Sequence, residues 1–417
     1  MKSRRLLPRA RLAALITLPL LTACDSLDQE PALSLVLDSA GIRVIENLHR
    51  PADVPLFATL DPMPVTEIGV VSGNPDQEFG WIKTAAYLPP DRILVADGQA
   101  RQLSVFNLDG NLLARLGGNG EGPGEFQTLS HVQALGTDSV AVWDGRARRI
   151  TVLPMGGTDP LTISLEGEAA SGIRSVQFLG DGTLIASRRP SRDEIRQYPE
   201  PTLVQDSVLL SHLSRSGEKE HRVGTFFSST RILQLTVDGS IVRTSEATPA
   251  FPRFSNWVCS SDRIIIGDNR SFGIDWFDFK GNLVQRMIAP GLEISLDPEV
   301  ASRVMERRIE AMGGTPEIRR QVEGIFEDFP LPEKVPSFTK LLLDDLGFLW
   351  VQEYHEDWKQ QATWYVFSPS GELAGRVSFP PGATVWTIDE EYVLLSPLHE
   401  LDVPVVQLFR LNRQQGP

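Results

Sequence analysis

The densest group of chemically versatile side chains lies in one short segment. Residues 353–358 (EYHEDW) bring carboxylates, an imidazole and aromatic rings together directly after an apolar run. Acidic groups beside aromatic rings suit the recognition of a sugar or a cation. Glu353, His355 and Trp358 are therefore candidate ligand contacts, and a solvated loop without a ligand is the alternative interpretation.

A compact basic run is the second candidate binding segment. Arg188 and Arg189 open residues 188–192 (RRPSR), which also follow an apolar run. Adjacent guanidinium groups suit an anion, because each offers several donors and a permanent positive charge. A plain surface loop is again the alternative.

Three aspartates recur at one place in the sequence pattern. Asp97, Asp144 and Asp268 each close an apolar run. If their loops converge on an axis, the carboxylates are candidate metal ligands. An Asp at such a place also accepts hydrogen bonds from the backbone two or three residues on and closes a turn. Recurrence in separate repeats favours turn capping, because a single central site does not explain it.

Signatures of catalysis are not found in the sequence. The six histidines, at positions 49, 131, 212, 221, 355 and 399, lack the spacing of a zinc site. The Gly-x-Ser-x-Gly element of serine hydrolases does not occur either. The sequence therefore predicts no metal site and no cofactor, and it favours a protein that is not an enzyme.

The first 23 residues are typical of a secretory signal peptide. A basic start precedes an apolar run at 12–21, which is shorter than the ~20 residues of a membrane-spanning helix. Residues 21–24 (LTAC) resemble the bacterial lipobox, in which the Cys becomes residue one and carries the lipid. We expect lipidation of Cys24, with palmitate-type acyl chains, and a location on the bacterial cell envelope. An ordinary signal peptide with a chance Cys is the alternative.

The charge balance argues against nucleic acid as a partner. The chain has 40 Lys and Arg against 54 Asp and Glu, a formal net charge of −14. The signal segment contains five basic and no acidic side chains, so the mature charge falls to −19. An acidic surface repels phosphate backbones and anionic lipid headgroups alike. Membrane attachment is therefore expected to depend on the lipid at Cys24.

An internal repeat of about 45 residues positions all of these side chains. Around Asp97, Asp144 and Asp268 another Asp stands six residues earlier, an apolar residue eight later and a Gly thirteen later. Phe79 and Phe126 are 47 residues apart, as are Asp97 and Asp144. Such a period, with several short strands in each unit, is typical of a β-propeller.

Counting the units predicts an all-β, six-bladed β-propeller over residues 64–412, preceded by a tether and N-terminal segment at 24–63. The expected blades are 81–118, 126–166, about 180–223, 251–289, 336–379 and 384–412. The strand at 65–69 matches the third strand of a blade yet precedes the first blade. We expect it to pair with C-terminal residues and to close the ring, which removes exposed sheet edges.

The segment 118–126 (GNGEGPGEF) and the recurrent strand–Asp–loop–strand unit resemble a known family. Together they look like the bacterial six-bladed β-propeller family related to NHL repeats, whose members are often envelope lipoproteins. The resemblance covers roughly residues 64–412 and is strong in blades 1, 2 and 4. It implies the fold and the location. It implies no catalytic residues, because the family has no agreed activity.

A short helical insertion interrupts the β pattern at 297–329. Asp297-Pro298 is a good helix start, and apolar spacing predicts a helix over 299–312. A second helix is expected from about 317 to 327. The insertion is interpreted either as a decorated connection between blades or as a lid or docking arm over one face of the ring.

These observations favour a non-enzymatic binding or scaffold propeller on the envelope, with a protein, peptide or carbohydrate ligand that the sequence does not identify. A second hypothesis is a metal-dependent hydrolase or lyase with its site in the central channel, which rests on analogy with other six-bladed rings. A third is the capture of carbohydrate or peptide on the loop face.

Overall fold

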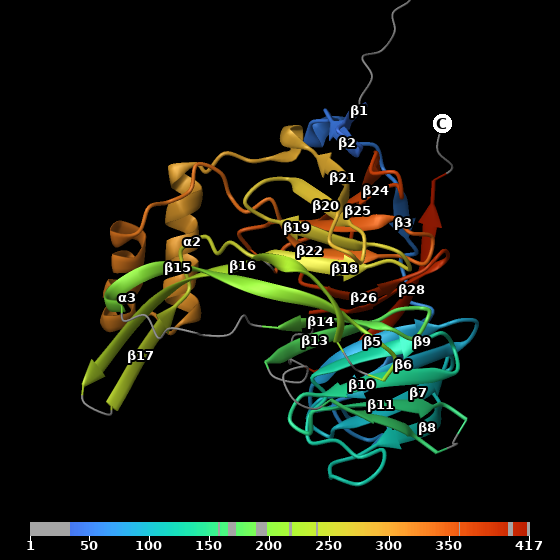
Figure 1. Cartoon of the computed structure of the whole chain (residues 1–417). Coiled ribbons are helices and arrows are strands. Elements are labelled where there is room, and N and C mark those ends of the chain that lie inside the picture. The colour runs from blue at the N-terminus through green and yellow to red at the C-terminus, as the bar shows by residue number, and fades with distance from the viewer. Residues whose placement is uncertain are drawn as a thin grey trace, which may run out of the picture. The chain divides into compact units, whose positions relative to one another are not determined.

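Six sheets make up the part of the chain that the structure describes (Figure 1). This computed structural model describes residues 34–156, 159–165, 172–188, 198–216, 219–238, 241–357, 359–398 and 403–414. The predicted signal segment and Cys24 lie outside these ranges. Three sheets have four strands, two have five and one has six.

The sheets follow one another in chain order, and each is one blade. Blade 1 holds β5 (Ile82–Leu88), β6 (Arg92–Asp97), β7 (Gln102–Asn107) and β8 (Leu112–Gly117). Blade 2 holds β9 (His131–Leu135), β10 (Ser139–Asp144), β11 (Arg149–Pro154) and β12 (Leu161–Ser164). Blade 3 holds β13 (Ile173–Phe178), β14 (Leu184–Arg188), β15 (Tyr198–Leu213), β16 (Lys219–Asp238) and β17 (Ile241–Ala247).

The remaining blades include strands from the N-terminal segment. Blade 4 holds β18 (Ser255–Cys259), β19 (Ile264–Asp268), β20 (Gly273–Phe277) and β21 (Leu283–Ile288), with β1 (Ser34–Ser39) and β2 (Ile42–Asn47) at its outer edge. Blade 5 holds β22 (Phe338–Leu343), β23 (Leu349–Glu353), β24 (Thr363–Phe367) and β25 (Leu373–Ser378). Blade 6 holds β26 (Thr384–Ile388), β27 (Tyr392–Ser396) and β28 (Val406–Arg413), with β3 (Ala58–Leu60) and β4 (Thr66–Ile68).

Successive blades are joined through their first strands. β5 contacts β9, β9 contacts β13, β18 contacts β22, and β26 contacts β5. Gln133 and Gln177 each exchange two hydrogen bonds with the backbone of the next blade, at 2.8 to 3.3 Å. Lys340 Nζ donates to Val385 O at 2.5 Å and joins blade 5 to blade 6. The predicted six-bladed β-propeller is confirmed.

The ring is closed by strands from both ends of the chain. β28 pairs with β27 on one edge and with β4 and β3 on the other. The expected pairing of residues 65–69 with the C-terminal strand is therefore confirmed. This pairing covers both edges of β28, so the last strand exposes no unpaired row of backbone groups.

The residues before blade 1 run along the outer edges of three blades. β2 lies parallel to β21 of blade 4, and Phe57 N donates to Arg376 O of blade 5 at 2.9 Å. The buried Asn47 side chain joins these two blades, since it donates to Gly371 O at 3.0 Å and accepts from Leu373 N at 2.8 Å. Residues 24–63 were predicted to be a tether and N-terminal segment, whereas residues 34–60 contain three strands that join blades 4 and 6.

Blade 3 departs furthest from the repeat. β15 and β16 are 16 and 20 residues long, and they pair with each other over most of that length. The paired strands continue past the blade to the helical insertion, and β17 pairs along the far part of β16 (Figure 1). The blade was predicted to end at about residue 223, but β16 and β17 extend it to residue 247.

A recurring turn joins the third and fourth strands of the regular blades. Asn107 and Asp278 hold the same place in blades 1 and 4, and Oδ1 of each accepts two backbone hydrogen bonds at 2.8 to 3.1 Å. Gly110 and Gly281 complete these turns with φ of +78° and +88°. A Cβ on Gly281 would lie 2.1 Å from Val223 O, so glycine is required there for space as well.

Candidate ligand-binding groove at the helical insertion

Two helices lie between blades 4 and 5. α2 (Pro298–Ala311) begins after Asp297, whose carboxylate accepts a backbone hydrogen bond of 2.7 Å in the first turn. α3 (Pro316–Asp328) begins after Thr315, whose hydroxyl accepts a similar bond of 3.3 Å. Two glycines at 313–314 with positive φ reverse the chain between the helices. The predicted helical insertion is confirmed.

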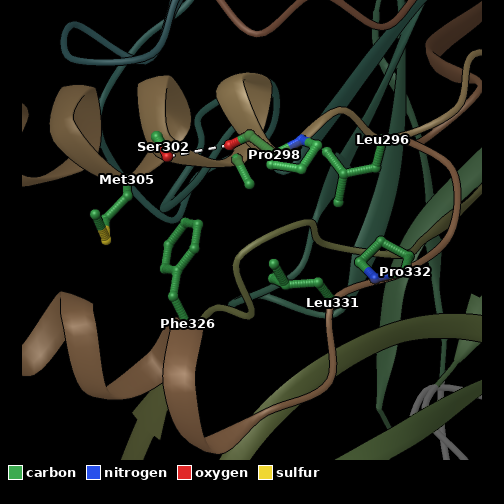
Figure 2. A pocket seen from close by; sticks show the side chains of 8 residues that line it. Leu296, Pro298, Ser302, Met305, Phe326, Leu331 and Pro332 are labelled. Carbon is green, nitrogen blue, oxygen red and sulfur yellow. Dashed lines mark hydrogen bonds between the residues drawn. The ribbon is translucent and has the colours of Figure 1, made fainter.

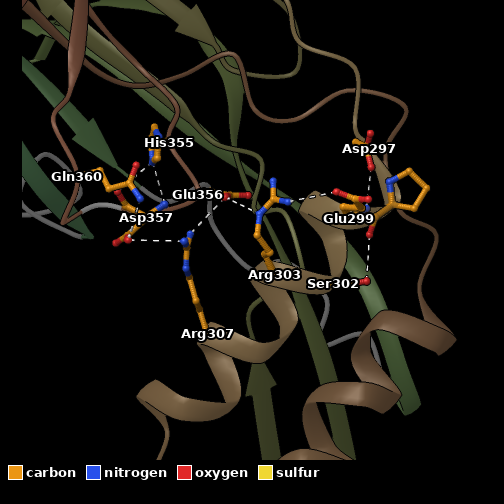
Figure 3. Close-up of polar contacts among 10 residues, drawn as sticks. Asp297, Glu299, Ser302, Arg303, Arg307, His355, Glu356, Asp357 and Gln360 are labelled. Carbon is orange, nitrogen blue, oxygen red and sulfur yellow. Dashed lines mark hydrogen bonds and ion pairs between the residues drawn. The ribbon is translucent and has the colours of Figure 1, made fainter.

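Ion pairs attach α2 to the loop that follows β23 in blade 5 (Figure 3). Arg303 Nε donates to Glu356 at 2.8 Å, and Arg307 lies 3.5 Å from Glu356 and 3.6 Å from Asp357. The Glu356 side chain is only 16% exposed, so these charges are less screened than an ordinary surface pair. Part of the candidate segment 353–358 therefore holds the insertion in place.

An apolar groove lies between the two helices and the chain that follows α3 (Figure 2). We call it the insertion groove, and it is lined by Leu296, Pro298, Ala301, Ser302, Met305, Phe326, Leu331 and Pro332. Its volume is about 410 Å³, within the range of ~300–1,000 Å³ found for small-molecule sites. The Ser302 hydroxyl already donates to Pro298 O at 3.0 Å. The groove therefore suits an apolar group.

A second cavity of about 290 Å³ lies beside the insertion groove, against the β15–β16 extension. We call it the hairpin pocket, and it is lined by Leu203, Gln205, Thr230, residues 249–251, Arg253, Arg270 and residues 329–332. Leu331 and Pro332 line both cavities. The ring centroids of Phe251 and Phe326, one from each lining, are 6.4 Å apart. The two cavities are therefore neighbours.

The hairpin pocket contains two guanidinium groups and little compensating charge. Arg253 donates to the backbone oxygens of Asn269 and Lys334, at 3.2 and 2.9 Å. Burial lowers the pKa of Arg253 from its usual value; the Asp268 carboxylate opposes this change, and the nearby Arg270 adds to it. Arg270 pairs with Asp268 and stacks on the Phe227 ring, 4.5 Å from its centroid. The Asp268 carboxylate is thus the negative charge that interacts with both Arg253 and Arg270.

Glu353, a predicted ligand contact, is partly buried at the end of β23. Tyr365 donates its hydroxyl to Glu353 Oε1 at 3.1 Å. Burial raises the pKa of Glu353, and the hydrogen bonds from Tyr365 and Thr363 oppose that change. The carboxyl is already engaged within blade 5, and its role as a ligand contact stays a prediction.

The other predicted contacts are placed in different ways. His355 is exposed, and its Nδ1 lies 3.0 Å from the backbone N and O of Asp357 within the same loop. Arg188 is buried at the end of β14 and donates to Ser211 Oγ at 3.2 Å, so this residue is not in a surface loop. Trp358, Arg189 and Cys24 lie outside the described residues.

The recurrent aspartates cap turns. Asp97 Oδ1 accepts from Gln99 N and Ala100 N at 2.8 and 3.1 Å, and its Oδ2 accepts from Gly80 N at 2.9 Å. Asp144 makes the same two turn contacts through Oδ1, at 3.1 and 3.0 Å. The turn-capping interpretation is confirmed for both. Within the described ranges, no three His, Cys, Asp or Glu side chains are grouped as a metal site requires.

Two ionisable side chains on the first strands of blades 5 and 2 were not proposed as site residues from the sequence. Burial lowers the pKa of Lys340 to about 8, and it lowers the pKa of His131 to about 4. Both lie on first strands, where side chains meet the neighbouring blade. Their burial depends on contacts with distant residues, so no local sequence signal could have revealed it.

The groove residues were missed for a related reason. Ala301 and Met305 are four residues apart, which is a helical signal that the sequence does contain. The opposite wall comes from Phe326 and Leu331, and their approach to α2 depends on how the insertion folds back.

In the described part of the chain no helix has the length and apolar character needed to cross a membrane.

Comparison with known proteins agrees with the fold. Residues 74–150 match a family model described as a 6-bladed beta-propeller. This match covers blade 1 and the beginning of blade 2, where the repeat is clearest. No curated protein matches the sequence.

Solved structures with related arrangements come from several bacteria. One is a Bacteroides fragilis protein inferred to be exported, with 9% identity, coverage of 89% of this chain and 100% of that one, and a TM-score of 0.47. Another is a member of the DUF4221 family from Bacteroides vulgatus, with 9% identity, 86% and 99% coverage, and a TM-score of 0.45. A catalytically inactive virginiamycin B lyase variant from Staphylococcus aureus has 12% identity, 86% and 100% coverage, and a TM-score of 0.37.

Proposed function

We propose that this protein is a lipid-anchored, NHL-like propeller of the bacterial cell envelope that binds a ligand with an apolar group and catalyses no reaction. The insertion groove carries the binding part of the proposal. Its volume of about 410 Å³ suits a small ligand, and its lining offers apolar side chains from two helices and a proline-rich segment. The ring acts as the scaffold that fixes this groove.

The attachment of the helices supports a preformed site. Arg303 and Arg307 tie α2 to blade 5, and Arg319 joins α3 to Glu306 of α2 through two hydrogen bonds of 2.8 Å. Walls fixed in this way lose little conformational freedom when a ligand binds, which favours affinity.

A neutral fluorescent probe tests the binding site. We expect N-phenyl-1-naphthylamine to bind the full chain saturably at one site. Ser302→Trp places an indole in the groove and should weaken that binding by about tenfold or more. Glu310→Trp adds the same ring at an exposed position of α2 outside the groove lining and should bind as the unaltered protein does. Equal binding by both variants, or no binding by the unaltered protein, would contradict the proposal.

The membrane anchor is proposed from the lipobox at residues 21–24 and has a separate test. The unaltered chain, expressed in a bacterium, should be found in the membrane fraction and take up labelled palmitate. Cys24→Ser should release it to the soluble fraction. A protein that stays soluble without this substitution would contradict the anchor and leave the groove unaffected.

The loop contacts predicted from the sequence remain a second candidate site. Glu353 Oε1 accepts a hydrogen bond from the Tyr365 hydroxyl, and the remaining acceptor capacity of this partly buried carboxyl suits a sugar hydroxyl. Loss of carbohydrate binding on Glu353→Gln, with the fold intact, would favour this site over the groove.

A further inference from the structure

We infer that the ligand is an amphipathic anion, with its apolar tail in the insertion groove and its carboxylate or phosphate head at Arg253 and Arg270 in the hairpin pocket. This inference rests on the proposed function of the groove. It adds the chemistry of the head group, which the groove alone does not define.

The two arginines of the hairpin pocket carry more charge than their neighbouring carboxylate neutralises. Asp268 is the carboxylate that pairs with Arg270 and also acts on Arg253, so the three side chains together carry one net positive charge. Arg253 donates hydrogen bonds to the backbone oxygens of Asn269 and Lys334, which carry no formal charge to balance it. An anion would relieve the repulsion between the two arginines and add charge-assisted hydrogen bonds.

The positive charge of the hairpin pocket is opposite in sign to the net charge of the chain. The chain has a formal net charge of −14, which disfavours the approach of an anion in general. A pocket that brings two guanidiniums to one carboxylate is therefore complementary to an anion at this place. Arg270 remains accessible, with 49% of its side chain exposed, while its stacking on Phe227 fixes the direction of the guanidinium.

The insertion groove and the hairpin pocket share part of their lining. Leu331 and Pro332 line both of them, and Phe251 and Phe326 approach each other across the same region. The hydroxyl in the groove is already bonded to its own helix. The insertion groove has no charged side chain in its lining, whereas the hairpin pocket adds two arginines to walls that are also largely apolar. An amphipathic anion matches this combination.

Calorimetry with three probes of equal chain length tests the head group. Dodecanoate, dodecanol and dodecyltrimethylammonium are titrated, below their micelle concentrations, into the full chain carrying Cys24→Ser. We expect dodecanoate to bind about tenfold more tightly than either of the others, with an advantage that shrinks at high salt. Ser302→Trp should weaken all binding.

Arginine variants separate a head-group contact from a structural role. Arg270→Gln should weaken dodecanoate binding by about tenfold and leave dodecanol binding unchanged. Arg263→Gln removes an exposed arginine that pairs with Asp262 outside both cavities, and it should change neither. If Arg270→Gln has no more effect than Arg263→Gln, or if the three probes bind equally, the anionic head is disproved and the apolar groove stands.

Vesicles distinguish the two sources of such a ligand. Binding of the Cys24→Ser chain to phosphatidylglycerol vesicles, lost in Ser302→Trp and in Arg270→Gln, would assign the site to a phospholipid. Binding of dodecanoate without binding to vesicles would assign it to a free amphiphile. If neither is bound, both this inference and the proposed groove function fail.

Discussion

In blades 1 and 2 the second strand ends on Asp97 and Asp144, whereas the corresponding strands of blades 3 and 5 end on Arg188 and Glu353. The two aspartates bond to the backbone of the next turn and keep the loop short. After Arg188 the chain enters the long β15–β16 extension, and after Glu353 it forms the loop that binds α2. The repeat therefore specifies the ring, and departures from it mark where additional elements are attached.

The same contrast separates scaffold from candidate site. Blades 1 and 2 bury a shared apolar cluster between them, and neither contributes to the insertion groove or the hairpin pocket. The insertion groove is built from the insertion and the chain on either side of it, and the hairpin pocket adds the β15–β16 extension and the edge of blade 4. Variation outside the regular blades can thus alter the ligand without altering the ring.

The largest loss of stability is expected in the regular blades 1 and 2. Asp144 is fully buried and accepts four hydrogen bonds, from Gln127 N, Thr128 Oγ1 and two residues of its own turn. Asp144→Ala leaves these donors unpaired and should lower the free energy of unfolding by about 4 kcal/mol. Chemical denaturation followed by fluorescence measures it. A loss below about 1 kcal/mol would mean that the cap is dispensable.

The pH dependence of stability tests the contact that Lys340 makes between blades 5 and 6. Lys340 joins blade 5 to blade 6, as Gln133 and Gln177 join other neighbouring blades. Its pKa is lowered from 10.5 in the unfolded chain to about 8 in the folded protein. Between these values the unfolded chain holds a proton that the folded chain lacks. The free energy of unfolding should therefore rise with pH from about 8 to about 10.5, by at most about 3 kcal/mol.

Lys340→Gln is the matched variant, because an amide can still donate to Val385 O. It should abolish the rise between pH 8 and 10.5 while the ring stays closed. Denaturation series at several pH values provide the measurement. A rise of the same size in the variant would assign the pH dependence to another group.

A smaller and local effect is expected where the insertion joins the ring. The double substitution Arg303→Ala, Arg307→Ala removes the ion pairs to Glu356 and Asp357. The local stability of α2 should fall, so that its amides exchange faster, with no change in the blades. Hydrogen exchange measures this difference residue by residue. Arg320→Ala, which removes a largely exposed pair with Glu317, is the control.

The smallest effect is expected where the repeat begins to fail. Asp268 holds the place of Asp144 in blade 4, but its side chain is 28% exposed and pairs mainly with Arg270. Asp268→Ala should cost about 1 kcal/mol or less. It should also strengthen dodecanoate binding, because the hairpin pocket then lacks its carboxylate. A loss of stability equal to that of Asp144→Ala would show that the aspartates of blades 2 and 4 have the same role, which contradicts the comparison.

The sequence predicted the ring well because its signals are local. Asp97, Asp144 and Asp268 mark strand ends within a few residues of themselves, and Asp297-Pro298 marks a helix start in the same way. The pairing of β2 with β21 joins residues more than two hundred positions apart, so no local pattern announces it. The insertion groove and the hairpin pocket have the same origin, since their walls come from segments that meet only in the folded chain.

Photo-crosslinking of a diazirine-labelled alkyl carboxylate to the unaltered protein, followed by peptide mapping, tests the central claim most directly. The account predicts labelling of α2, of α3 and of residues 329–332, and loss of that labelling in Ser302→Trp. Labelling concentrated on the first strands of the blades, around Lys340 and His131, would place the ligand away from both cavities and contradict the proposal.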